Sequence, residues 1–164
     1  MTDPLSRRGV RSFSASLDIE ASAQDAFSLL CAVEKWPVWL SFLRSSRRAI
    51  SDSPLAIGSE VLVRSTLPAE EEELYEVDQL IGNFQLSFVG AYSTRRRLEF
   101  RLEQKTSRAR LSVKLSYPAY HGRVGDLVDR WTNGRKVDRA LENSLLHFKG
   151  LVEYRTRDGV LADL

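Results

Sequence analysis

The sequence has few of the residues that support disulfide, redox or metal chemistry. It contains one cysteine, Cys31, and two histidines, so neither an intrachain disulfide nor a Cys/His metal cluster is expected. It also lacks a glycine-rich phosphate loop, a nucleophile elbow and metal-ligand spacing. No apolar run reaches the roughly 18 residues that a spanning helix needs, and residues 1–11 do not resemble a signal peptide. We therefore expect a cytoplasmic protein with no membrane span, no metal and no cofactor.

The charge is nearly balanced, which argues against a nucleic-acid partner. The chain has 24 basic and 22 acidic residues, for a formal net charge of +2. Arginines concentrate in residues 44–48 and 95–97, but neither run is interleaved with aromatic residues that could stack on bases. The acidic run 70–73 offsets them. We interpret all three runs as solvated strand faces or loop ends, and a homodimer is compatible with the sequence.

The length and composition indicate a single domain. With 164 residues, 43% of them hydrophobic, the chain can bury a substantial core. No internal repeat or linker divides it. We expect the folded domain over residues 11–156, a loose N-terminal tail over 1–10 and a C-terminal tail over 157–164.

The first third of the chain predicts a strand followed by two short helices. Apolar residues alternate with polar ones over 11–20, which is typical of a half-buried strand. Ser22 is a favourable N-cap, with Asp25 in the first turn of the helix that it begins. Pro37 predicts that this helix ends or bends near Trp36. A second short helix is expected over residues 39–43.

The rest of the chain predicts six strands and one long helix, and so an α+β fold. The strands are expected over residues 44–51, 59–66, 72–80, 84–89, 95–104 and 108–117. The last two alternate most regularly, which is typical of an antiparallel sheet covered on one face. Leu141, Leu145, Phe148 and Val152 recur at spacings of three and four, which predicts a helix over 132–154 capped by Thr132 or Asn133.

Three segments resemble the START-like (SRPBCC, helix-grip) superfamily, in particular its polyketide cyclase/dehydrase branch. They are LDIEASAQDAFSLL over 17–30, EKWPVW over 34–39 and VDRALENSLLHFKGLVE over 137–153. The resemblance implies a helix-grip fold: a seven-stranded curved antiparallel sheet around a long C-terminal helix, with two short helices after the first strand. It further implies an internal cavity between sheet and helix for a small hydrophobic or aromatic molecule.

Strand parity and helix periodicity identify the side chains that would surround such a cavity. The same residues could instead fill it, because apolar periodicity usually indicates burial. The expected ligand-binding residues are Trp36, Phe42, Val63, Tyr75, Val77, Leu98, Phe100, Val113, Tyr117, Trp131, Leu141 and Leu145; Val61 and Leu115 share their parity.

Candidate catalytic residues are His121, Asp138 and Tyr117. His121 precedes the last helix and could act as an acid or base, although an ordinary loop histidine fits equally well. Asp138 could be a desolvated carboxylate facing the cavity or a solvated residue in the first turns of the helix. In cyclase relatives, pocket Arg and Tyr side chains are thought to hold the polyketide. Parity places Arg64 and Arg110 outside the sheet.

Three functions stay open at this stage. The first is a binding or carrier protein for a small hydrophobic or aromatic molecule. The second is a cofactor-independent cyclase or aromatase that acts on a bound reactive chain by acid/base chemistry. The third is an interaction module with a filled core.

Overall fold

A computed structural model describes residues 9–67, 70–118 and 125–158. Side chains of residues 93–95 and 125–133 also lie outside the description. His121, the side chain of Trp131 and most of both expected tails therefore fall outside the described residues.

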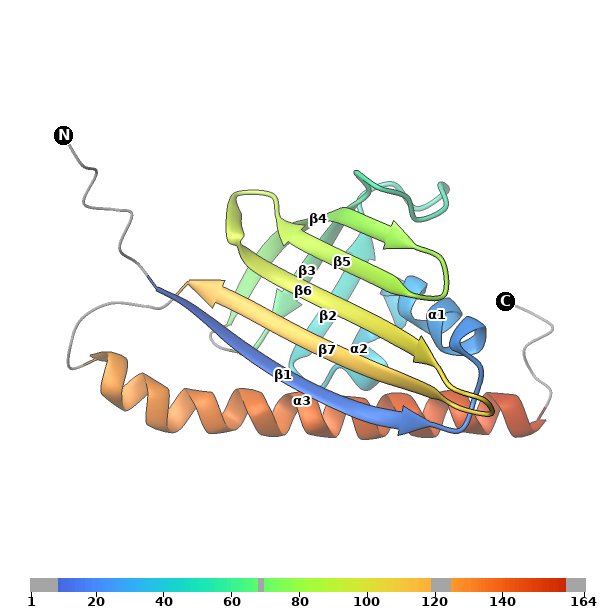
Figure 1. The fold of residues 1–164 in the computed structure, drawn as a ribbon. Coiled ribbons are helices and arrows are strands. Elements are labelled where there is room, and N and C mark those ends of the chain that lie inside the picture. The colour runs from blue at the N-terminus through green and yellow to red at the C-terminus, as the bar shows by residue number, and fades with distance from the viewer. Residues whose placement is uncertain (1–8, 68–69, 119–124, 159–164) are drawn as a thin grey trace.

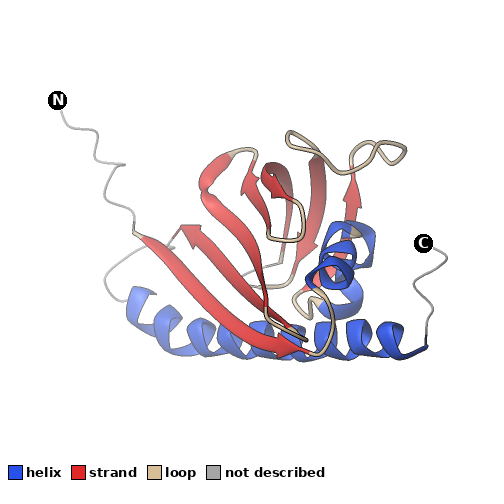
Figure 2. Ribbon diagram, turned by 45° about the vertical axis from the view of Figure 1, so that its right-hand side comes forward, coloured by secondary structure: helices blue, strands red, loops and turns tan. Residues whose placement is uncertain are grey.

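Seven antiparallel strands form one curved sheet (Figure 1). In chain order they are β1 (Val10–Ile19), β2 (Leu43–Arg48), β3 (Glu60–Ser65), β4 (Glu71–Ile81), β5 (Gln85–Gly90), β6 (Ser93–Gln104) and β7 (Ala109–Pro118). Their order in the sheet is β1-β7-β6-β5-β4-β3-β2, so the first strand pairs with the last and every other neighbour is sequential. The strands curl over the long C-terminal helix (Figure 2). The predicted helix-grip fold is confirmed.

The short helices lie where predicted, but the second begins earlier than expected. α1 (Ala23–Cys31) starts with the Ser22 hydroxyl accepting the Asp25 N–H at 3.1 Å. A 3₁₀ turn, η2 (Val33–Lys35), leads directly into α2 (Trp36–Trp39). The predicted helix over 39–43 is wrong, because Pro37 stands in the first turn of α2, where a missing N–H costs nothing. Leu43 already belongs to β2.

The last helix, α3 (Gly125–Asp158), begins seven residues before the predicted start. Its 34 residues correspond to about 51 Å. Thr132 and Asn133 therefore lie inside the helix and do not cap it. Gly134 has a low helix propensity, lies inside both the predicted and the observed helix, and packs close to β1 in the structure. A Cβ added at Gly134 would lie 3.6 Å from Cε1 of Phe13.

An aromatic core joins the short helices, the sheet and α3. The Trp36 ring meets Phe88 at 4.9 Å and Phe100 at 5.7 Å between ring centroids. Trp39 bridges to α3 through Phe148, at 4.7 Å. The Trp36 Nε1–H donates to the Leu30 carbonyl at 2.8 Å, which gives its buried polar atom a partner. The core is therefore densely filled at the end of the sheet that carries α1 and α2.

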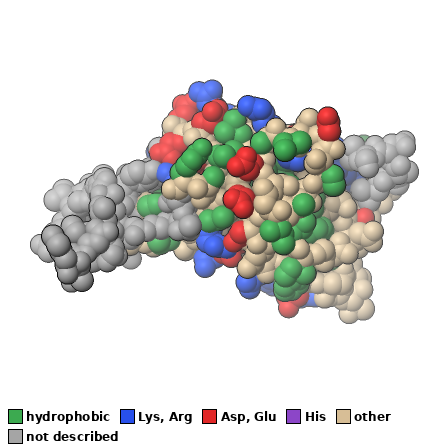
Figure 3. Space-filling view, turned by 90° about the horizontal axis from the view of Figure 1, so that it is seen from above, with side chains coloured by type: hydrophobic (Ala, Val, Ile, Leu, Met, Phe, Trp, Pro, Cys, Tyr) green, Lys and Arg blue, Asp and Glu red, His purple; other side chains and the backbone are tan. Residues whose placement is uncertain are grey.

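The surface and the helices add two observations. On the face seen from above, basic, acidic and hydrophobic side chains are interspersed (Figure 3). No helix in the described part of the chain is long and apolar enough to cross a membrane.

Candidate functional site

A small hollow lies beneath the sheet at the end away from α1. It forms where β3 and β7 end and where β4 and β6 begin. Side chains from five strands and from the segments beside them surround it: Phe42, Leu43, Val63, Ser65, Leu67, Glu73, Tyr75, Arg96, Leu98, Leu115 and Tyr117. Its volume is about 20 Å³, which is room for about one water molecule. Among the described residues, this hollow is far smaller than the ligand cavity expected from the sequence, and none of the residues around it lies on α3.

One end of this hollow carries a buried ion-pair cluster. Arg96 is only 9% exposed, and its Nη2 lies 2.7 Å from Oε2 of Glu71. The Nε of Arg96 lies 2.7 Å from Oε1 of Glu73. The Tyr75 hydroxyl donates to the other Glu73 oxygen at 3.1 Å. Strands β4 and β6, which both pair with β5, thus bring together three charges and a phenol.

The cluster perturbs the protonation of two of its members. Burial raises the pKa of Glu73, and the neighbouring Glu71 adds to the effect. The attraction of Arg96 and the hydrogen bond from Tyr75 oppose this rise without cancelling it. The pKa of Tyr75 is raised well above its usual range, chiefly by burial and then by the adjacent Glu73 carboxylate. Tyr75 therefore stays protonated and acts as a hydrogen-bond donor.

The hollow gathers five of the residues expected to bind a ligand: Phe42, Val63, Tyr75, Leu98 and Tyr117. Leu115, of the same parity, joins them. Six others lie in the buried core away from the hollow: Trp36, Val77, Phe100, Val113, Leu141 and Leu145.

The candidate catalytic residues do not come together. Tyr117 is buried beside the hollow, with its ring stacked on Phe13 at 5.7 Å between centroids. Asp138 is exposed and lies well inside α3, so neither the desolvated carboxylate nor the first-turn position expected for it fits. Arg64 is exposed and Arg110 pairs with Asp18 at 3.5 Å, so neither reaches the hollow.

Sequence reasoning missed Glu71, Glu73 and Arg96. We interpreted the runs 70–73 and 95–97 as solvated, and that interpretation is wrong for these three side chains. Strand alternation could have indicated their position. Glu71 and Glu73 lie on the same face of their strand as Tyr75, and Arg96 lies on the same face as Leu98. Opposite charges on two nearby strands, both in phase with the apolar face, indicate a buried ion pair.

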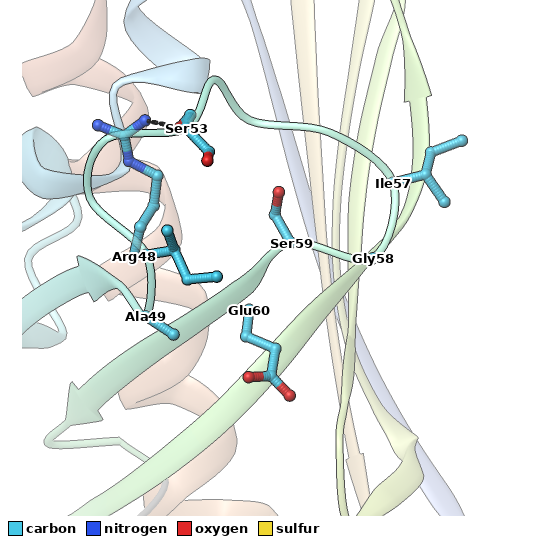
Figure 4. A pocket seen from close by; sticks show the side chains of 8 residues that line it. Arg48, Ala49, Ser53, Ile57, Gly58, Ser59 and Glu60 are labelled. Atoms are coloured by element: carbon cyan, nitrogen blue, oxygen red, sulfur yellow. Dashed lines mark hydrogen bonds between the residues drawn. The ribbon is translucent and has the colours of Figure 1, made fainter.

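A larger groove lies on the surface at the loop between β2 and β3. It measures about 290 Å³ and is bordered by Arg48, Ser53, Ser59 and Glu60, among others. Its side chains do not converge: Ile57 points away, and Arg48 turns back to donate to the Ser53 carbonyl (Figure 4). Arg48 is also held by Glu34, at 2.7 Å. The groove therefore lacks the convergent polar groups typical of a ligand site.

Comparison with known structures defines the class of protein: the chain has the START-like helix-grip fold. It is similar to the Zhui aromatase/cyclase from Streptomyces sp. R1128, with a TM-score of 0.73 and 14% identity over 92% of this chain and 98% of that one. The protein TTHA0849 from Thermus thermophilus gives a TM-score of 0.69 with 12% identity, over 87% of this chain and 97% of that one.

A START superfamily protein from Mycobacterium smegmatis gives a TM-score of 0.60 with 14% identity, over 92% of this chain and 99% of that one. No protein-family model and no curated protein matches the sequence. The likenesses therefore define the fold and leave the activity to be argued from the site.

Proposed function

We propose that this protein binds a small hydrophobic or aromatic molecule in the hollow beneath the sheet. The observation that carries the proposal is the hollow's composition: apolar side chains on most sides and one fixed polar cluster at one end. Ligand sites commonly combine an apolar wall with a few oriented polar groups. Arg96 is buried and its two carboxylate partners are half-buried, so charged groups stand beside the hollow where their desolvation is costly.

The ligand must widen the hollow in order to enter it. A volume of about 20 Å³ is far below the several hundred that ligand pockets offer. Ser65, Leu67 and Tyr75 at its rim are only half-buried, so their side chains can turn outward without losing a fully buried position. Binding then selects an opened form of the protein, and its affinity is reduced by the cost of that opening.

The test is calorimetric titration with 2-naphthol, a rigid aromatic probe. Ser65→Leu should weaken binding at least about tenfold, because the added carbons occupy the space that the probe needs. Arg64→Leu, on the outer face of the same strand, is the matched control and should change the affinity less than about threefold. Absence of heat and of any rise in melting temperature with the unaltered protein would overturn the proposal.

A cyclase or aromatase is the second candidate. The specific observation in its favour is the Glu73–Tyr75 pair at the hollow, since a carboxylate with a raised pKa beside a phenol can take up and return a proton. The Zhui aromatase/cyclase has a similar fold, which supports an enzymatic function by analogy only. Turnover of a poly-β-ketone thioester that is lost in Glu73→Gln would favour this enzyme over a carrier.

A further inference from the structure

The polar end of the hollow carries an unequal number of opposite charges. Glu71 and Glu73 both pair with the single guanidinium of Arg96. Glu73 and Arg96 are the charged residues among the described side chains around the hollow, with Glu71 behind Arg96. The carboxylate of Glu73 is therefore an acidic group that faces the hollow.

Arg96 is already engaged by these carboxylates and does not offer its charge to a ligand. Its Nε and Nη2 each meet a different carboxylate at 2.7 Å, which is the short distance of charge-assisted hydrogen bonds. A ligand carboxylate at Arg96 would have to displace one of them, and the displaced charge would remain in a buried place. A ligand anion in the hollow would also face Glu73 directly, where like charges repel strongly at low dielectric.

Glu73 keeps the capacity to accept a further hydrogen bond. A carboxylate offers about four lone-pair sites. In the described part of the chain, Arg96 and Tyr75 occupy two of them, one on each oxygen. Glu73 itself borders the hollow, so a donor on a bound molecule can reach it.

We propose that the hollow selects neutral ligands with a hydroxyl group that donates to the Glu73 carboxylate, and that it excludes ligands ending in a carboxylate. This inference rests on the binding function proposed above and deepens it. The apolar wall of Leu98, Leu115 and Phe42 holds the ligand body, and the acidic end chooses the ligand's polar group. Phenols and other neutral aromatic alcohols are the ligand class that fits both.

The test compares three probes that share one ring system: naphthalene, 2-naphthol and 2-naphthoate. At about pH 7, 2-naphthol is neutral and 2-naphthoate is charged, because aromatic carboxyls ionise near pH 4 and phenols near pH 10. Calorimetric titration should show 2-naphthol binding at least about tenfold more tightly than 2-naphthoate and several-fold more tightly than naphthalene.

Glu73→Gln should narrow the difference in affinity between 2-naphthol and 2-naphthoate to about threefold or less, because it removes the negative charge that faces the ligand. Glu72→Gln removes one negative charge from the exposed face of β4, and it should leave the difference in affinity between 2-naphthol and 2-naphthoate unchanged. The melting temperatures of both variants show that they are folded.

The outcomes separate the two proposals. If 2-naphthoate binds as tightly as 2-naphthol, or if Glu73→Gln leaves the preference intact, the selection of neutral alcohols is wrong while ligand binding stands. If none of the three probes binds the unaltered protein, the binding function fails and this inference fails with it.

Discussion

The environment of Glu73 departs from what its sequence neighbours suggest. It stands in a run of four glutamates, yet its side chain is four-fifths buried, between Arg96 and Tyr75. Burial outweighs the attraction of Arg96, so its pKa is raised. The folded protein therefore holds this proton more tightly than the unfolded chain does.

The raised pKa predicts how stability changes with pH. The stabilising contribution of Glu73 is fully present below the usual glutamate pKa and is lost as pH rises through the raised folded value. The free energy of unfolding of the unaltered protein should therefore fall relative to that of Glu73→Gln as the pH rises above about 4.

Urea unfolding at several pH values measures this difference. Glu99→Gln, on the outer face of β6, provides the background pH dependence of a glutamate outside the hollow. The opposite result would be a free energy of unfolding of the unaltered protein that rises relative to that of Glu73→Gln as pH rises. It would show that the attraction of Arg96 outweighs the effect of burial on Glu73.

At the scale of elements, α3 packs close to β1 at Gly134. Phe13 lies beneath this glycine and stacks on Tyr117, which borders the hollow. A Cβ at Gly134 fits at van der Waals distance, whereas a longer side chain would meet the Phe13 ring. The position thus tolerates one added carbon and not several.

Gly134→Ala should stabilise the protein by about 0.5–1 kcal/mol, because alanine has the higher helix propensity. Gly134→Leu should instead destabilise it by about 1–3 kcal/mol through overpacking against Phe13. Gly150, on the same helix with nothing within 4 Å, is the matched control, and both of its substitutions should stabilise. Chemical denaturation measures all four variants; a stable Gly134→Leu would contradict the close approach of α3 to β1.

The same elements show what a sequence can and cannot predict. Strand positions followed from alternation, and the start of α1 followed from Ser22, because both signals are local. The start of α3 was misplaced because Thr132 and Asn133 are residue types that often cap a helix, whereas here the helix continues through them. The helix Trp36–Trp39 was misplaced because a proline can end one helix or begin the next.

At the scale of the whole molecule, the fold was predictable and the hollow was not. Apolar residues of the right parity were identified, but the size of a cavity depends on which side chains fill it. Trp36, Phe100 and Leu141 pack into the core, while Leu98, Leu115 and Tyr117 surround the hollow. Phe100 and Leu98 lie on the same face of β6 and differ only in their position along the strand.

The proposed ligand site therefore lies at one end of the sheet, between the filled aromatic core and the half-buried residues Ser65, Leu67 and Tyr75. Movement of Leu67 and Tyr75 at the rim, rather than rearrangement of the core, is expected to admit a ligand. Binding should accordingly perturb β3, β4, β6 and β7 near the hollow and leave α1 and α2 unaffected.

A crystal structure of the protein with 6-bromo-2-naphthol tests this most directly, because the anomalous signal of bromine locates the ligand independently of its fit to density. We expect the bromine beneath the sheet near Leu98 and Leu115, and the hydroxyl oxygen within hydrogen-bond distance of Glu73. Bromine in the groove between β2 and β3 or on the outer face of the sheet, with the hollow still closed, would contradict the proposed site.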